Sequence, residues 1–325
     1  GLFPICAAMK NASKAIMYEP FFVVLHEEKE NALPFPCGGY LIAESEQELR
    51  QRLEKNPESL IRAYSKNRYY TGLKVATKIW VGNYQSDART FEELAERAKD
   101  AGAIRRIGVL RADVDNMGQA FTAGFSETYN TLSRTATLSR QLSLFFKCYI
   151  NEILAHRKYR FGIGEGPRNA TIVYSGGDDL FIVGAWNEVI ELAVDIRDAF
   201  AKYTEGTLTI SAGIGMYTPK YPISQIAYEV GDLEEESKNM PEKNSITILP
   251  DGERHSVVLP DGQEKSVADG TYTWEDFKEH VIEEKYQLIS GFFEGTEERG
   301  TAFLYHLLEL IRDRKEKINF ARYVY

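Results

Sequence analysis

The stretch that decides the fold is TIVYSGGDDLFIVGA, residues 171–185. Two apolar runs rich in β-branched and aromatic residues flank a Gly-Gly-Asp-Asp tetrapeptide, which is the pattern of two strands joined by a tight turn. We therefore predict strands over 171–175 and 180–185, with Gly176 to Asp179 as the turn of a β-hairpin. Such a turn places its two carboxylates at one end of a sheet.

Extended and helical patterns alternate on both sides of this hairpin. Three further strands are predicted, at 104–112, 208–216 and 245–249. Apolar residues at helical spacing predict three helices, over 133–156, 188–203 and 223–238. The order β-α-β-β-α-β is the split, ferredoxin-like arrangement. We expect an α+β domain over residues 104–248, with an antiparallel sheet and helices on one face.

The remaining sequence divides into two regions around this central domain. Residues 1–103 are interpreted as a mixed α/β linker domain, with strands at 21–25 and 78–81 and helices at 44–55 and 91–101. Residues 249–325 begin with two Leu-Pro-Asp-Gly turns, which predict a surface hairpin. A C-terminal helical domain follows, capped by Thr273 and with an apolar stripe at Phe303, Leu307, Leu310 and Ile311.

Composition and charge narrow the class of protein. The 325 residues carry a net charge of −9, which argues against a free-standing nucleic-acid binder. We see neither a signal peptide nor an apolar run long enough to span a bilayer. The three cysteines, Cys6, Cys37 and Cys148, are scattered, so we interpret them as reduced thiols of a cytoplasmic protein with no membrane partner. The missing initiator Met suggests a piece of a longer protein.

Asp113 and the turn aspartates predict a metal site. In the expected sheet, the strand that ends at Asp113 lies beside the hairpin that carries Asp178 and Asp179. Clustered carboxylates repel one another unless a cation neutralises them, and oxygen ligands suit Mg²⁺ or Mn²⁺ bridging to a phosphate. A pair of such ions can activate an attacking hydroxyl and stabilise a leaving pyrophosphate. The alternative, a plain turn with solvated aspartates, is disfavoured by the matching Asp113 strand.

The glycines and two downstream lysines point to phosphate. Gly176 and Gly177 are expected to allow a positive φ and a close approach of phosphate to backbone N–H groups. Lys238 ends a predicted helix, and Lys243 precedes the last strand of the domain, so both could reach a triphosphate. The competing interpretation is that these lysines balance the acidic run at 234–236 on the surface.

At this point the residues resemble a known family. Segments 108–118, 138–146, 174–180, 231–234 and 243–247 resemble the large palm-containing subunit of type III-A (Csm) CRISPR effector complexes, whose palm is similar to GGDEF cyclase domains. The resemblance extends from about residue 82 to the C-terminus and is strongest in the palm.

This resemblance implies an activity and its residues. Subunits of this kind bind ATP and, when the complex holds crRNA and target RNA, join ATP into cyclic oligoadenylates. Metal ions would be held by Asp113, the Val114 carbonyl, Asp178 and Asp179, which are also the catalytic carboxylates. The nucleotide would be bound by a larger set: Gly118, Ser139 near the adenine, Gly176, Gly177, Lys238, Lys243 and Asn244.

Two alternatives remain beside this interpretation. A diguanylate cyclase would need a guanine-reading polar pair, but the corresponding positions are Phe121-Thr122, and segment 160–175 lacks the aspartate of a product-inhibition site. A non-catalytic scaffold palm is expected to lose its carboxylates, and all three are present. We recognise neither the family's histidine-aspartate nuclease domain nor its first palm. The chain alone is therefore expected to bind ATP and to turn over poorly without the first palm and the other Csm subunits.

Overall fold

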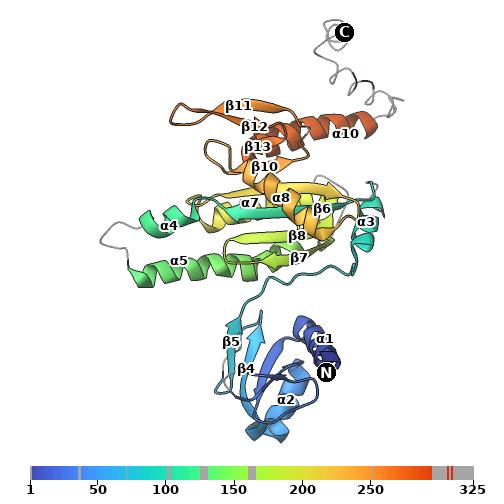
Figure 1. Cartoon of the computed structure of the whole chain (residues 1–325), viewed down its shortest axis with the longest axis vertical. Coiled ribbons are helices and arrows are strands. Elements are labelled where there is room, and N and C mark those ends of the chain that lie inside the picture. Colours follow the sequence, from blue (N-terminus) through green and yellow to red (C-terminus); the bar gives the residue numbers. More distant parts are fainter. Residues whose placement is uncertain are drawn as a thin grey trace, which may run out of the picture. The chain divides into compact units, whose positions relative to one another are not determined.

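Figure 1 shows the computed structural model of the chain. The structure describes residues 2–35, 38–70, 72–100, 104–124, 131–159, 166–250 and 252–294, with His306 and Glu309. Two compact units are present, Gly1–Thr271 and Tyr272–Tyr325. The predicted apolar stripe at 303–311 lies outside the described side chains. No helix in the part of the chain that the structure describes combines the length and apolar character needed to cross a bilayer.

The N-terminal region begins with helix α1 (Leu2–Tyr18) and forms a five-stranded sheet of order β2-β3-β1-β4-β5. Its strands are β1 (Phe21–Leu25), β2 (Leu33–Pro34), β3 (Tyr40–Glu44), β4 (Leu60–Lys66) and β5 (Val75–Ile79). The predicted strand at 21–25 is therefore confirmed, whereas the one predicted at 78–81 begins earlier. The short 3₁₀ helix η1 (Pro57–Ser59) precedes β4.

Helix α2 (Glu46–Lys55) starts two residues later than predicted because Ser45 is its N-cap. The Ser45 side chain accepts a hydrogen bond from the Glu48 N–H, and the Glu48 carboxylate accepts one from the Ser45 N–H at 2.9 Å. This reciprocal capping box satisfies two amides that the first helical turn would otherwise leave open.

The central domain is built on a six-stranded sheet of order β13-β10-β9-β6-β8-β7. The strands are β6 (Ile107–Val114), β7 (Ala170–Ser175), β8 (Asp179–Ala185), β9 (Ile210–Tyr217), β10 (Ser245–Ile248) and β13 (Thr271–Thr273). β6 pairs antiparallel with β8 and with β9, and β7 pairs antiparallel with β8, as the hairpin predicted. β10 pairs parallel with β9, so the sheet is mixed rather than antiparallel throughout.

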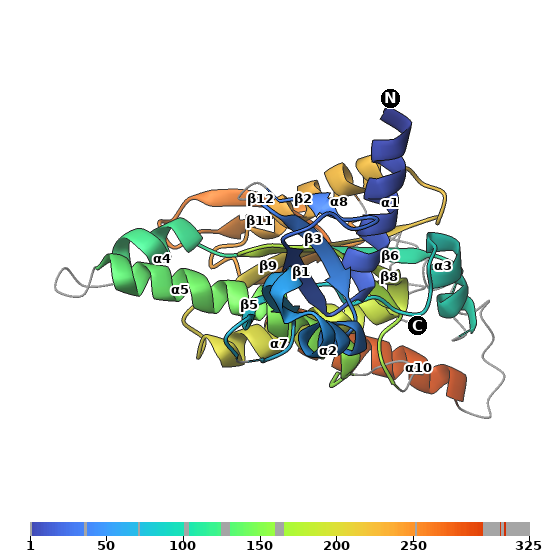
Figure 2. The same cartoon turned by 90° about the horizontal axis from the view of Figure 1, so that it is seen from below.

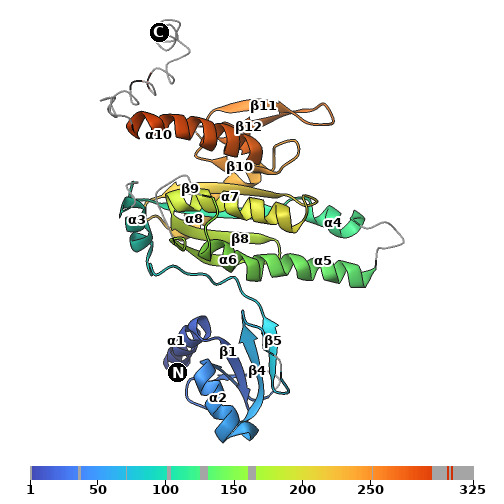
Figure 3. The ribbon, with the colours of Figure 1, turned by 180° about the vertical axis from the view of Figure 1, so that it is seen from behind.

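Helices cover both faces of this sheet, so the prediction of helices on one face is wrong. On one face, α7 (Trp186–Tyr203) packs so closely that a Cβ at Gly108 would lie 3.1 Å from Val189. On the other, Val109 and Val183 pack with α3 (Phe91–Asp100) and α8 (Ile223–Ser237). Figure 1 shows α8 in front of the sheet, and the opposite view in Figure 3 brings α7 forward. The reason is the parallel β9–α8–β10 connection, which takes its helix across the second face.

The predicted helix at 133–156 is confirmed as a continuous helical segment with an irregular turn. It consists of α5 (Leu132–Leu144), a π-helical turn η2 (Phe145–Tyr149) and α6 (Ile150–Ala155). Phe145 and Phe146 in this turn pack against Phe200 of α7 with ring centroids 5.1 Å and 5.8 Å away. A further short helix, α4 (Met117–Ala123), was not predicted and lies beside α5 (Figure 2).

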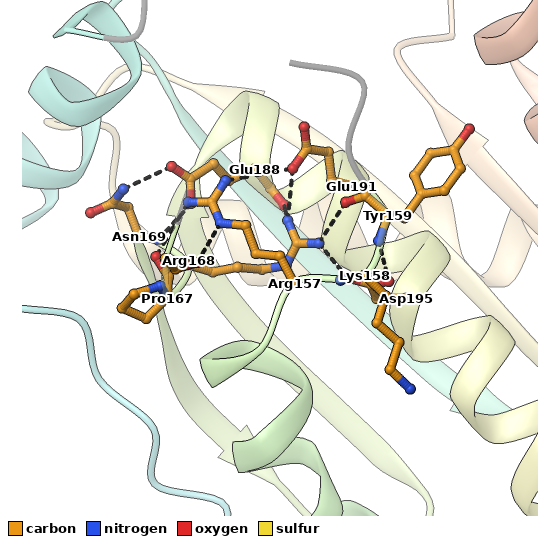
Figure 4. A network of polar contacts seen from close by, with 10 residues as sticks. Arg157, Lys158, Tyr159, Pro167, Arg168, Asn169, Glu188, Glu191 and Asp195 are labelled. Carbon is orange, nitrogen blue, oxygen red and sulfur yellow. Dashed lines mark hydrogen bonds and ion pairs between the residues drawn. The ribbon is translucent and has the colours of Figure 1, made fainter. Parts of the chain in front are cut away.

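A buried ion network fastens the segment before β7 to α7 (Figure 4). The guanidinium of Arg168, whose side chain is fully buried, binds Glu191 at 2.9 Å and also contacts Asp195. The Arg157 guanidinium binds Glu188 at 2.5 Å. The Asp195 carboxylate also accepts the Tyr159 N–H at 2.8 Å. Three carboxylates of one helix are thus matched by two arginines and by backbone donors.

The predicted surface hairpin is confirmed by β11 (Arg254–Val258) and β12 (Glu264–Ala268), which form a two-stranded antiparallel sheet. The C-terminal unit holds α9 (Trp274–Asp276), a π-helical segment η3 (Phe277–Tyr286) and α10 (Gln287–Glu294). Thr273 caps α9 as predicted, because its hydroxyl accepts the Asp276 N–H at 3.1 Å.

Candidate active site

The Gly-Gly-Asp-Asp segment forms the turn between β7 and β8. The Gly176 N–H donates to the Asp179 carbonyl at 2.8 Å, which closes the turn just where β8 begins. Neither turn glycine has a positive φ, so that expectation is wrong. A glycine is needed at position 176 because there is no room for a side chain. A Cβ there would lie 2.6 Å from the Asp179 carboxylate and would collide with the Tyr174 hydroxyl. A Cβ at Gly177 would meet only Ser143, at 3.8 Å.

Asp113 lies directly opposite the turn. It is the register partner of Asp179 on β8 and of Ser211 on β9. The Val114 N–H donates to the Asp178 carbonyl at 3.2 Å, which ties the end of β6 to the turn. The strand end and the hairpin therefore meet as expected, and the three aspartates occupy one edge of the sheet.

The surroundings of Asp178 raise its affinity for a proton. Burial, followed by the negative charges of Asp113 and Asp179, raises the pKa of Asp178 above its usual value. The ammonium of Lys238 opposes this rise. A divalent cation at the three carboxylates would favour the ionised form of Asp178. The donor set thus fits a hard cation such as Mg²⁺ or Mn²⁺.

Lys238 supplies the only positive side chain that contacts Asp113 among the described residues. Its ammonium contacts the Asp113 carboxylate and lies 2.6 Å from Glu234. Burial alone would lower the pKa of Lys238, but the hydrogen bond to Asp113 and the ion pair with Glu234 outweigh it and raise the pKa. Within the described residues, no three His, Cys, Asp or Glu side chains are already arranged around a metal position. The Lys238 ammonium instead contacts one carboxylate oxygen of Asp113.

Lys243 and Asn244 lie in a strained turn next to Asp115. Both residues have a positive φ, 55° and 44°, as does Asn116 at 53°. The Asp115 carboxylate accepts the Asn244 N–H at 3.0 Å and the Thr209 hydroxyl at 2.8 Å. The Lys243 ammonium donates to the Asn116 side chain at 2.7 Å. The two loops are thus joined by one buried carboxylate, and left-handed backbone of this kind gathers at functional sites.

Two predicted nucleotide-binding residues lie on helices at this end of the domain. Ser139 is exposed on α5 and lines a cavity of about 610 Å³ together with Gln141 and Ser143 of the same helix. Since Ser143 also faces Gly177, this cavity reaches the turn. Gly118 is in α4, where a Cβ would meet no atom within 4 Å.

Three site residues escaped the sequence-based prediction. Glu234 was interpreted as surface charge, yet its side chain is 7% exposed and pairs with Lys238. Asp115 was not predicted as a site residue, although the Asp-Val-Asp spacing places it two residues from Asp113. The charge of Asp179, then burial, raises the pKa of Tyr174, whose hydroxyl lies against that carboxylate. Only the Asp-Val-Asp spacing was a visible signal in the sequence.

Comparisons with known proteins agree with this geometry. The family described as Cas10/Cmr2, second palm domain, matches residues 106–247, and the second helical domain of the Cmr2 subunit of the CRISPR RNA silencing complex matches residues 290–325. The chain is 43% identical to the CRISPR system single-strand-specific deoxyribonuclease Cas10/Csm1 (subtype III-A) of Mycobacterium tuberculosis, over 99% of the chain and 38% of that protein. It is 37% identical to the protein of the same name from Enterococcus italicus, over 100% of the chain and 39% of that protein.

A solved Csm1–Csm4 subcomplex of the type III-A interference complex has the same fold, with a TM-score of 0.61 and 26% identity over 86% of this chain and 38% of that one. The chain thus spans well under half the length of the relatives it matches. Sequence identity over its whole length, the matched palm family and the shared fold agree with one another. The chain therefore belongs to the Cas10/Csm1 family of type III-A CRISPR systems.

Proposed function

We propose that this chain provides the nucleotide-joining palm of a type III-A CRISPR complex, where it converts ATP into cyclic oligoadenylates once target RNA is bound. The observation that carries the proposal is the in-register pairing of Asp113 with Asp179 beside the glycine turn. Solved Csm1–Csm4 cassettes include one in complex with ATP and one with cA4, each 24% identical to this chain. A likeness at that identity shows the fold alone. Our assignment of ATP to this chain therefore rests on the chain's own residues.

The reaction we propose is a nucleotidyl transfer. The 3′-hydroxyl of one ATP attacks the α-phosphorus of another, a new P–O bond forms, the α–β phosphoanhydride bond breaks, and pyrophosphate and the hydroxyl proton leave. Bound Mg²⁺ or Mn²⁺ would lower the pKa of the hydroxyl and neutralise the leaving pyrophosphate. Asp113, Asp178, Asp179 and the Val114 carbonyl would hold these ions.

The remaining residues would bind and orient the nucleotide. Lys238 and Lys243 carry positive charge to the edge of the cluster, where triphosphate oxygens would lie. Asn244 would be positioned by its N–H contact with Asp115, and Gly118 and Gly177 leave open space for phosphate. Gly176 would contribute by letting the turn pack tightly against Tyr174 and Asp179. Ser139 lines the neighbouring cavity, whose size suits a purine nucleoside.

The proposed setting is a cytoplasmic complex in which other Csm subunits, crRNA and target RNA control the palm. The first palm of the longer subunit would bring the attacking nucleotide. A diguanylate cyclase is disfavoured because Phe121-Thr122 occupy the guanine-reading positions. A non-catalytic scaffold is disfavoured because all three carboxylates are present.

The experiment is incubation of the assembled complex with target RNA, Mn²⁺ and labelled ATP or GTP. We expect oligoadenylates from ATP and a loss of at least about 100-fold in rate for the variant Asp178→Asn/Asp179→Asn. The matched control is Asp198→Asn, an exposed aspartate on α7 that pairs with Arg197. Products from GTP alone would contradict the adenine preference, and full activity of the double variant would contradict the site.

A further inference from the structure

Lys238 connects the acidic cluster to a second, buried carboxylate. Lys238 is the C-cap residue of α8, and Glu234 lies one turn earlier, within the helix. The ammonium lies 2.6 Å from Glu234 Oε1 while it also contacts Asp113 Oδ2. One lysine is thus shared between a carboxylate of the proposed metal site and a carboxylate outside it.

Glu234 is held in place by close packing of its backbone. A Cβ at Gly213 of β9 would lie 2.5 Å from the Glu234 N atom, so α8 approaches the sheet where no side chain separates them. Arg111 Nε lies 3.6 Å from Glu234 Oε2. Gly231 leaves room for this arginine, because a Cβ there would lie 2.9 Å from Arg111 Nη1. The carboxylate position is therefore set by the sheet and the helix together.

Burying the Glu234 carboxylate costs free energy unless hydrogen bonds or a counter-ion compensate it. Oε1 of Glu234 is buried and has no partner with hydrogen-bond geometry, so the Lys238 ammonium at 2.6 Å is its counter-ion. Burial of a charge with incomplete hydrogen bonding destabilises a fold. The side chain that this charge restrains is Lys238, whose other contact is Asp113.

The ammonium and a metal ion would compete for one carboxylate group. Lys238 contacts Asp113, which is the register partner of Asp179. A cation that binds Asp113 must displace the ammonium or share the carboxylate with it. Because Glu234 binds the same ammonium, Lys238 can leave Asp113 without losing its counter-ion.

We propose that Glu234 is a positioning residue that keeps Lys238 as a resident cation on Asp113 and retains it when a divalent ion takes its place. Metal binding is then an exchange of cations at Asp113. Glu234 supports it by giving Lys238 a second anchor, next to the substrate phosphates. This inference rests on the proposed metal site but concerns a step that precedes nucleotide binding.

The test is a double-mutant cycle on Mn²⁺ affinity, measured by calorimetry on the full chain without nucleotide. Lys238→Met removes the competing cation, and we expect it to tighten Mn²⁺ binding about tenfold. Glu234→Gln leaves Lys238 with Asp113 as its only anion, and we expect binding to weaken about fivefold. In the Lys238→Met background the same Glu234→Gln change is expected to alter affinity less than about twofold, because it acts through Lys238.

A matched control separates this role from a general field effect. Glu235→Gln removes the same charge from the neighbouring, exposed position of α8 and is expected to leave Mn²⁺ affinity unchanged. Unfolding curves of each variant report whether the fold is intact. An equal effect of Glu234→Gln in both backgrounds would overturn the inference, since Glu234 would then act on the metal directly.

The outcome also distinguishes this inference from the proposed function. If the cycle behaves as expected while the assembled complex makes no oligoadenylate, the proposed reaction fails and the cation exchange stands. If oligoadenylate forms but the two changes are additive, the exchange fails and the reaction stands. If neither the wild-type chain nor Lys238→Met binds Mn²⁺, both the metal site and the exchange are refuted.

Discussion

Two clusters of three carboxylates lie in the same domain and are neutralised in different ways. On α7, Glu188, Glu191 and Asp195 have side chains at most 6% exposed and face two arginines. At the sheet edge, beside Asp178 and Asp179, Asp113 is 28% exposed and pairs with Lys238. The α7 cluster is closed by its own cations, whereas the edge cluster is closed by a single side chain that a stronger cation can displace.

The difference lies in the number and geometry of the donors. Arg168 presents several fixed N–H groups and divides them among two carboxylates and two backbone carbonyls. Lys238 is a flexible point charge with two anionic contacts. A buried, multiply bonded guanidinium cannot leave without stranding charge, and an ammonium at a half-open edge can. Residue composition alone does not distinguish a structural acidic cluster from an exchangeable one.

The largest effect is expected from Arg168→Met in the closed cluster. It leaves Asp195 without its arginine, while Glu191 keeps Arg157 at 3.6 Å. Loss of one partner of such a buried network costs about 3–5 kcal/mol of the free energy of unfolding. Urea denaturation of the chain would measure this loss. A change below about 1 kcal/mol would mean that water or a nearby side chain replaces the arginine, and the cluster would not be closed.

A pH effect of intermediate size is expected in the edge cluster without metal. Since the folded state raises the pKa of Asp178 above its ordinary 3.8, it binds the proton more tightly than the unfolded chain. As pH rises from the ordinary pKa through the raised one, the unfolding free energy must therefore fall. The Asp178→Asn variant has no carboxyl that titrates at this position. Between the ordinary and the raised pKa, the wild type should therefore lose stability relative to the variant.

Denaturation curves of both proteins in a chelator, from about pH 4 to about pH 8, test this expectation. Mn²⁺ should reverse the trend for the wild type, because a bound cation favours the ionised carboxylates. Parallel curves of the wild type with and without Mn²⁺ would indicate that the cation does not bind the ionised aspartates.

The smallest effect is expected from Arg197→Met, the matched control for Arg168 on the same helix. Arg197 pairs with Asp198 at 3.0 Å, and their side chains are 21% and 40% exposed. A solvent-exposed pair of this kind contributes about 0–1 kcal/mol, so the unfolding free energy should barely change. A loss as large as that of Arg168→Met would show that burial is not what separates the two arginines.

Much of the fold follows from local patterns. The hairpin around Gly176 to Asp179 was predicted because alternating apolar runs and a glycine turn are short-range signals. The face covered by α8 was not, because it depends on β10 pairing parallel with β9. Helix α4 was missed since it has seven residues and follows a left-handed Asn116.

Some residues of the candidate site could likewise be predicted from the sequence, and others could not. Asp113, Asp178 and Asp179 were found because the motif and its strand are visible in the sequence. The task of Glu234 was not visible: it depends on Lys238 reaching Asp113, 125 residues away, and on α8 resting against Gly213. Likewise, Asp115 gains its role only where the 243–244 turn meets it.

The sequence by itself determined the carboxylate motif, the order of strands and helices along the chain, and the family resemblance, because these depend on residue type and spacing. The tertiary structure alone decided which cation each acidic cluster holds. That choice depends on burial and on contacts between residues far apart in the chain, which set the cost of leaving a charge unpaired. Carboxylates of the same types are therefore held by buried arginines on α7, whereas at Asp113 they face a lysine that we propose a metal ion replaces.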